Sequence, residues 1–299
     1  MQRSQPLKAA FWMAGAMASF SLMAIAGREL GGHLDTFEIM MYRSFLGVVI
    51  VLVAAKLAGT LGDIGFTQLK LHFVRNSCHF VGQNLWFYAV TIVPLSQLFA
   101  FEFSSPLWVV VLAPIFLGET LTRTKIFAAL LGFTGILIVA RPGSVAIDSG
   151  IIAAATCAIF FAGTTMATKK LTGSQSITSI LFWLVTMHSV FGLVCAGFDG
   201  QIVVPQGMEI VLVVIIGVCG LLAHFCITKA LNLAPATVVT PLEFLRLPLI
   251  AFIGFVLYKE AFEWPVILGA VLVLAANTIN IRAENMRNKR LSPIRQNGA

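Results

Sequence analysis

Two stretches that lie 141 residues apart, PLSQLFAFEF at 94–103 and PATVVTPLEF at 235–244, place a proline and a Glu-Phe pair at the same positions. The same offset, applied without gaps, aligns further identical residues: Leu30 with Leu171, Ile39 with Ile180, Leu71 with Leu212, Cys78 with Cys219, Ala89 with Ala230 and Glu119 with Glu260. Chance rarely supplies two glutamates, a proline and one constant spacing together. The chain is therefore predicted to contain two copies of one unit.

The composition indicates that each unit lies in a membrane. Hydrophobic residues make up 58% of the chain and charged residues only 11%, with a mean hydropathy of +0.92, whereas soluble domains are about 25% charged. A helix that crosses the hydrocarbon needs about 20 apolar residues. Such runs are predicted at 9–27, 37–57, 71–91, 95–117, 124–141, 149–168, 176–198, 209–229, 236–257 and 264–282. The expected fold is an all-α integral membrane protein with about ten transmembrane helices.

The two units are expected to have inverted topology. Each contains five spans, and an odd number of crossings makes the second unit enter the membrane from the opposite side. We place the first repeat at residues 1–145, the second at 146–282 and a cytoplasmic basic tail at 283–299. The apolar run 9–26 resembles a signal peptide, but it aligns with 149–168 and is interpreted as the first helix.

The basic residues predict the orientation of the chain. If the N-terminus is cytoplasmic, nearly all Lys and Arg residues outside the spans fall on the inside, and only Arg28, Arg141 and Lys259 fall outside. This bias predicts a multi-pass protein of the inner or plasma membrane with both termini in the cytoplasm. It also accounts for the net charge of +7. Nucleic acid is not expected as a partner, because no basic stripe alternates with aromatic residues.

Several motifs resemble one known family. They are Pro106-Leu107-Trp108, Leu117-Gly118-Glu119-Thr120-Leu121 and Gly132 to Val139 ending in Arg141-Pro142-Gly143, with Ala234-Pro235-Ala236 and Tyr258-Lys259-Glu260 in the second half. The sequence resembles the drug/metabolite transporter superfamily, specifically its EamA-type branch with two five-helix repeats. The resemblance implies a central cavity between the repeats and alternating access. Such transporters carry amino acids, nucleotide sugars, vitamins and other metabolites.

Glu102 and Glu243 are the leading candidates for a substrate site. A charge within the hydrocarbon costs about 2.5–3.5 kcal/mol or more, so each one needs a reason. Both lie about eight residues into their spans from loops on opposite sides, which predicts a midplane location. The pair could bind a cationic group or take up and release a proton. Alternatively, each glutamate pairs with a nearby arginine and only holds helices together.

Arg246 and Arg43 are the charged residues of opposite sign within the spans. Arg246 follows Glu243 by three residues on one helical face, but it could equally reach Glu102 or a substrate carboxylate. Arg43 either extends toward the headgroups or contacts substrate. Glu260, like Glu119, precedes a helix whose positive N-terminal end favours a carboxylate.

Helix 71–91 carries a polar stripe of Asn76, His79 and Gln83, and the offset aligns Gln83 with His224. The stripe either faces a water-filled cavity or bonds to neighbouring helices. His79 is a possible proton relay or a hydrogen-bonded structural residue, and His188 is interpreted as packing.

Prolines interrupt both glutamate-bearing spans. Proline removes a backbone donor and kinks a helix, so Pro106 and Pro248 are candidate hinges. The freed carbonyls could line a cavity.

The predicted function is secondary active transport of a small polar metabolite, an amino acid or related zwitterion, by alternating access and with possible coupling to protons. The alternatives are a membrane-embedded enzyme and a sensor or assembly subunit without transport activity. The sequence has no phosphate-binding loop, no HExxH and no GxSxG motif, and its histidines lack metal-ligand spacing. No cofactor or metal is expected, and the expected partners are the small-molecule substrate and the lipid bilayer.

Overall fold

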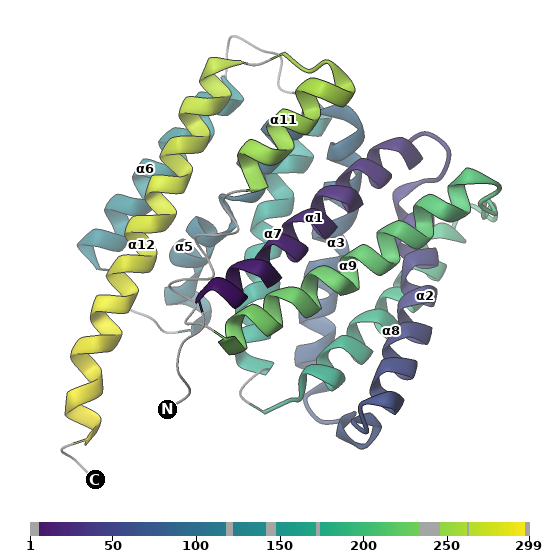
Figure 1. The fold of residues 1–299 in the computed structure, drawn as a ribbon, viewed down its shortest axis with the longest axis horizontal. Helices are drawn as coiled ribbons and strands as arrows, with labels where there is room; N and C mark the ends of the chain where they lie inside the picture. The colour runs from purple at the N-terminus through teal and green to yellow at the C-terminus, as the bar shows by residue number, and fades with distance from the viewer. Residues whose placement is uncertain are drawn as a thin grey trace. The chain divides into compact units, whose positions relative to one another are not determined.

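The computed structural model describes residues 6–117, 122–141, 148–171, 174–233, 246–261 and 263–296, which are predominantly helical (Figure 1). The elements are α1 (Pro6–Leu30), α2 (Thr36–Leu57), the 3-10 helix η1 (Leu61–Asp63), α3 (Leu69–Ile92), α4 (Leu95–Glu102), α5 (Ser105–Leu117), α6 (Arg123–Ala140), α7 (Ser149–Leu171), α8 (Ile177–Ala196), α9 (Met208–Leu233), α11 (Arg246–Tyr258) and α12 (Trp264–Gln296).

Most expected spans correspond to these helices with ends shifted by a few residues, but α12 continues beyond the expected end at 282, through the predicted tail, to Gln296. In the described part of the chain, six spans are long and apolar enough to cross a membrane, and shorter apolar helices accompany them. The span expected at 95–117 is divided into α4 and α5, and the span at 236–257 is described from Arg246 onward. The chain is an all-α integral membrane protein, as the composition predicts.

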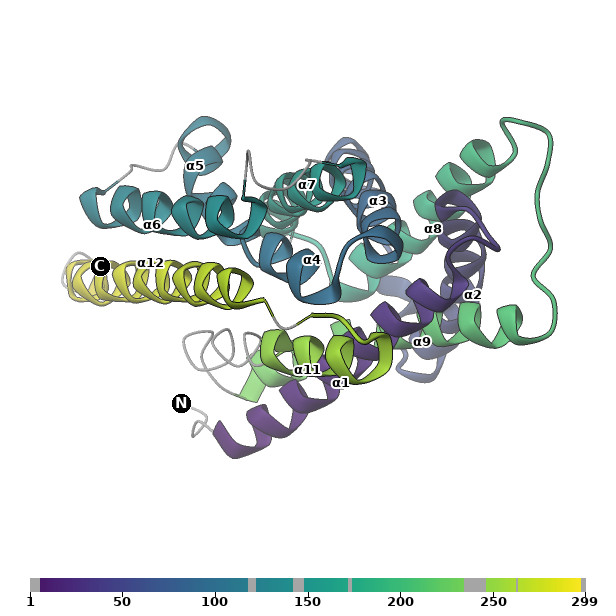
Figure 2. The same ribbon diagram turned by 90° about the horizontal axis from the view of Figure 1, so that it is seen from above.

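The helices form two compact units, each drawn from both halves of the sequence. Unit 1 comprises residues 1–14, 94–148 and 226–299, and unit 2 comprises residues 15–93 and 149–225. Within unit 1, α4 packs on α11 and α6 packs on α12, and Figures 1 and 2 show α6 and α12 side by side. Within unit 2, α2 packs on α8 and α3 on α7. The 141-residue offset aligns α2 with α8 and α6 with α12, so repeat-related helices pack against each other.

The offset also relates the caps of α2 and α8. The Asp35 carboxylate accepts the Glu38 N–H at 2.7 Å, and the Glu38 carboxylate accepts the Asp35 N–H at 2.9 Å, which forms a capping box. At the repeat-related position Ser176, the hydroxyl accepts the Ser179 N–H at 3.0 Å. Both side chains satisfy N–H groups that have no partner within their helix.

Two glycines allow α6 and α12 to approach closely. A Cβ on Gly135 would lie 2.6 Å from the Gly269 carbonyl oxygen, and a Cβ on Gly269 would lie 2.5 Å from the Gly135 carbonyl oxygen. A backbone oxygen cannot move aside as a flexible side chain can. Small residues at such crossings are typical of membrane helix pairs, which lack a strong hydrophobic force between them.

We therefore expect Gly269→Ala to lower the stability of the protein by about 1–3 kcal/mol through overpacking. Thermal unfolding in detergent micelles would measure the loss. Gly163→Ala on α7 is a matched control, because its new methyl group would meet the Cys78 side chain, with the sulfur at 3.2 Å and Cβ at 3.7 Å, and no backbone atom. Equal melting temperatures for Gly269→Ala and the unmodified protein would contradict the close crossing.

Candidate functional site

Glu102 and Arg246 form an ion pair in unit 1. Glu102 is the last residue of α4 and Arg246 the first of α11, and Nη2 of Arg246 lies 2.5 Å from Oε1 of Glu102. The side chains are only 18% and 9% exposed. The guanidinium carbon also lies 4.8 Å from the ring centroid of Phe99 and 5.2 Å from that of Phe103. From the sequence, Arg246 could pair with Glu243, with Glu102 or with a substrate carboxylate. The structure shows the contact with Glu102.

The ion pair lies where the fourth span is broken. The helix stops at Glu102 and resumes at Ser105. Nδ2 of Asn277 on α12 donates to the Phe103 carbonyl at 2.8 Å, and the Ser104 hydroxyl donates to the Phe101 carbonyl at 2.6 Å. Irregular backbone within a membrane protein is tolerated where protein groups satisfy it. The break is therefore a built feature that presents Glu102 at a helix end.

The other end of α4 is held by Glu260. The Leu95 N–H donates to both oxygens of the Glu260 carboxylate, each at 3.0 Å. A carboxylate is favourable at a helix N-terminus because backbone N–H groups and the helix dipole are positive there. The sequence predicted this interaction for the helix that follows Glu260, but the structure shows it at a helix remote in sequence. α4 is thus fixed at both ends by residues of the second repeat.

The polar stripe of α3 lies in unit 2 and bonds to α8. Asn76 donates to the Trp183 carbonyl at 3.0 Å and accepts from Arg75 at 2.8 Å. His79 stacks on His188 with ring centroids 5.1 Å apart, and Nε2 of His188 lies 3.1 Å from the Asn76 carbonyl oxygen. Gln83 is also buried. Of the two interpretations of the stripe, bonding to a neighbouring helix is the one that these contacts show.

Arg43 reaches inward to the same unit. It lines a cavity of about 20 Å³ together with His188 and His224, between α2, α8 and α9. Its Nη1 is fully buried, and the guanidinium carbon lies 6.0 Å from the Phe87 ring centroid. The Arg43 side chain thus reaches the cavity beside α9, and its role, architectural or in contact with substrate, stays a prediction.

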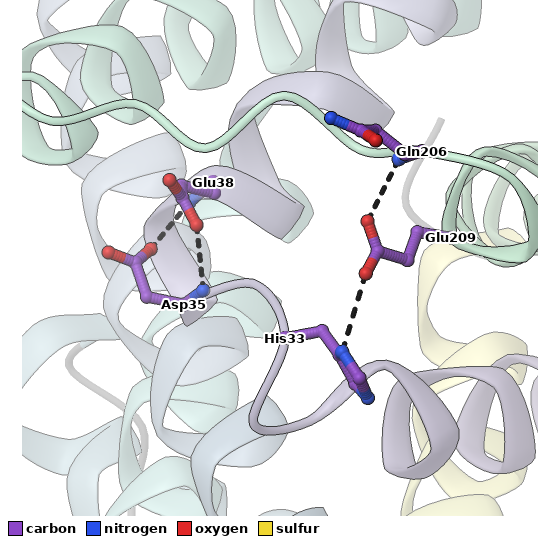
Figure 3. Close-up of polar contacts among 5 residues, drawn as sticks. All are labelled: His33, Asp35, Glu38, Gln206 and Glu209. Atoms are coloured by element: carbon purple, nitrogen blue, oxygen red, sulfur yellow. Dashed lines mark hydrogen bonds and ion pairs between the residues drawn. The ribbon is translucent and has the colours of Figure 1, made fainter.

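Two loops of unit 2 meet through a group of polar contacts (Figure 3). Glu209 accepts the Gln206 N–H at 2.8 Å and lies 3.3 Å from Nδ1 of His33, in the α1–α2 loop. Glu38, which is 2% exposed, also accepts the Val203 N–H at 2.5 Å. These contacts were not predicted from the sequence, although Asp-x-x-Glu at 35–38 is a recognisable capping signal.

The structure gives less information on the remaining predicted residues. Glu243 lies outside the described residues. Pro106 is the second residue of α5, and Pro248 lies in the first turn of α11. Their hinge roles stay predictions. In the described segments, no group of three or more His, Cys, Asp or Glu residues could hold a metal ion.

A family model matches almost the whole chain. The EamA-like transporter family matches residues 7–141 and again residues 148–282. The chain belongs to the EamA-like transporter family. It contains two EamA repeats in one all-helical chain, and the family consists of membrane transporters and not enzymes. The two matched segments agree with the 141-residue offset.

Several curated relatives of this EamA-like transporter carry substrate names. It is 26% identical over 273 residues to the S-adenosylmethionine uptake transporter of Rickettsia felis, which covers 91% of this chain and 92% of the relative. It is 26% identical to the riboflavin transporter of Vibrio cholerae over 96% of this chain and 97% of the relative. It is 26% identical to a pseudopaline exporter of Pseudomonas aeruginosa over 86% of this chain and 90% of the relative.

A solved crystal structure supports the fold of the EamA-like transporter. It superposes with a TM-score of 0.63 at 17% identity and covers 91% of this chain and 96% of that chain. The relatives and the family model together show a transporter of the drug/metabolite type.

The helix break that presents Glu102 gives a direct test. Asn277→Leu removes the side chain that donates to the buried Phe103 carbonyl, and we expect a loss of about 1–3 kcal/mol because that oxygen loses its partner. Thermal unfolding in detergent would measure it. Thr278→Val is the matched control, since the Thr278 hydroxyl donates within its own helix, to Leu274. An unchanged melting temperature for Asn277→Leu would show that the break does not depend on this bond.

Proposed function

We propose that this EamA-like transporter moves a small zwitterionic metabolite, an amino acid or a compound containing one, by alternating access. The observation that carries the proposal is the Glu102–Arg246 ion pair. It places a carboxylate and a guanidinium side by side inside the membrane-spanning part of unit 1, at the broken fourth span.

An ion pair of this kind is suited to exchange with a zwitterion. Removing one partner of a buried pair is costly because a charge is left uncompensated. A substrate with both an ammonium and a carboxylate group can replace each partner at once. Glu102 would then bind the ammonium group and Arg246 the carboxylate, so neither protein charge is left alone during the exchange.

The curated relatives are compatible with this substrate class and do not define it. S-adenosylmethionine carries an amino acid group, whereas riboflavin does not. The relatives also include uptake transporters and an exporter, so the direction of transport is not part of the proposal. Glu243, the repeat counterpart of Glu102, remains a predicted second contact for the substrate.

The transport cycle is proposed to rest on the inverted repeats. Proteins with such repeats alternate access by moving one bundle of helices around a site near the midplane. Because each compact unit combines helices of both repeats, the two units, and not residues 1–145 and 146–282 as separate bodies, are the parts that would move. The Lys and Arg bias supports cytoplasmic termini in the cell membrane. A gradient of substrate or protons would supply the energy, and protonation of Glu102 would release Arg246 from the pair.

The experiment is uptake into proteoliposomes of a panel of amino acids and S-adenosylmethionine, each beside an analogue whose carboxylate is an amide. We expect at least one zwitterion to be transported and its amide to be rejected. Glu102→Gln and Arg246→Gln should each lower that rate by at least roughly tenfold, as expected when one partner of a buried charge pair is lost. Asp63→Asn, which changes an exposed carboxylate in η1, is the control.

A charge reversal separates recognition from a purely structural role. The double variant with Glu102→Arg and Arg246→Glu retains an ion pair of the same two groups. If the pair only holds α4 to α11, the double variant should recover both stability and transport. If the pair binds substrate, stability should recover while transport stays low. Full transport by both single variants would refute the proposal.

A further inference from the structure

The small cavity of unit 2 is bounded by nitrogen-bearing side chains of three helices. Arg43 comes from α2, His188 from α8 and His224 from α9. Gly217 and Gly220 of α9 also line it and leave the space open beside the guanidinium. The volume of about 20 Å³ is enough for one particle of the size of a water molecule.

Arg43 brings a permanent positive charge to this cavity. Arginine keeps its proton in proteins, and an isolated charge within a membrane-spanning helix is expensive unless it is paired. Nη1 is buried and makes no hydrogen bond in the described structure. The Phe87 ring, 6.0 Å from the guanidinium carbon, gives only a weak cation–π contact.

The described residues of unit 2 supply no carboxylate to this cavity. All of its acidic residues lie in loops or in the terminal turns of helices: Glu29, Asp35, Glu38, Asp63, Asp199 and Glu209. Arg75, a second buried arginine of the unit, already donates to the neutral oxygens of Asn76 and Thr168. Within the described residues, neither Arg43 nor Arg75 therefore forms an ion pair with a carboxylate.

We propose that this cavity binds a small anion, of the size of chloride or of a single carboxylate group. Arginine has N–H donors and no acceptor, and Nη1 of Arg43 has no hydrogen-bond partner in the described structure. A neutral His188 has one N–H, which is directed at the Asn76 carbonyl oxygen, so the guanidinium is the donor for the cavity. A water molecule could fill the same volume but would leave the guanidinium charge uncompensated. An anion satisfies both the donors and the charge. The proposal does not depend on the substrate proposed for the Glu102–Arg246 pair.

One substitution closes the cavity without removing any charge. A Cβ on Gly220 would lie 3.7 Å from Nη2 of Arg43 and 3.7 Å from the sulfur of Met23, which is ordinary van der Waals contact. Gly220→Ala should therefore fold well, because alanine also favours a helix more than glycine does. Arg43→Gln removes the charge and keeps a polar, though shorter, side chain. Gly163→Ala is the control for a glycine-to-alanine change outside the cavity.

The test is thermal unfolding of the purified full chain in detergent, with sodium chloride or sodium formate replacing sodium gluconate at constant ionic strength. A ligand that binds only the folded state raises its stability in proportion to ln(1 + [L]/Kd). We expect the melting temperature of the unmodified protein to rise saturably, by roughly a few degrees. Gly163→Ala should show the same rise, and Gly220→Ala and Arg43→Gln should lose it.

The pattern of response identifies the source of the anion. A rise with both chloride and formate supports a site for a free inorganic anion. A rise with formate alone supports a site that selects a small carboxylate over a spherical anion. No rise with either anion overturns the proposal, as does an undiminished rise in Gly220→Ala. If Arg43→Gln fails to fold, Gly220→Ala still decides the question.

Discussion

Inside a bilayer a backbone N–H or carbonyl group must find its partner in the protein, because no water is available. The broken fourth span depends on this constraint more than any other part of the structure. At its start the Leu95 N–H binds Glu260, and at the break the Phe103 carbonyl binds Asn277. Both partners belong to the second repeat. The first repeat therefore cannot complete this span alone, which explains why unit 1 contains segments of both repeats.

The sequence predicted the spans well and their packing less well. Hydrophobicity marks a span locally, and most expected ranges match the described helices to within a few residues. The exception is α12, which continues to Gln296, because a helix can extend past the membrane where the sequence is no longer apolar. The 141-residue offset indicated which helices are related, but relatedness does not say which helices touch. Glu260 illustrates the difference. From its charge and position, Glu260 was predicted to lie at the N-terminus of the helix that follows it in the sequence. In the structure it instead accepts the N–H of Leu95, 165 residues away.

The candidate site shows the same limit. The cost of burying a charge pointed to Glu102 and Arg246 as candidates, and their role in binding substrate stays a prediction. Helical spacing left Arg246 with more than one possible partner, and the contact with Glu102 comes from the packing of α4 on α11. His188 was interpreted as packing since it has no counterpart in the repeat. Its contacts with His79 and Asn76 come from α8 lying against α3, which no pattern within either helix encodes.

The buried arginines of the two units differ in the groups that lie beside their positive charges. Arg246 contacts the carboxylate of Glu102 and the rings of Phe99 and Phe103, so a charge of opposite sign lies directly beside it. Arg75 has only neutral oxygens, which accept its hydrogen bonds without cancelling its charge. Nη1 of Arg43 has no hydrogen-bond partner among the described residues, and Arg43 lies beside a cavity that is large enough for one small particle. Because charges attract more strongly where water is excluded, this uncompensated positive region favours anions. The same burial that strengthens the Glu102–Arg246 pair thus makes the Arg43 guanidinium a favourable place for the proposed anion.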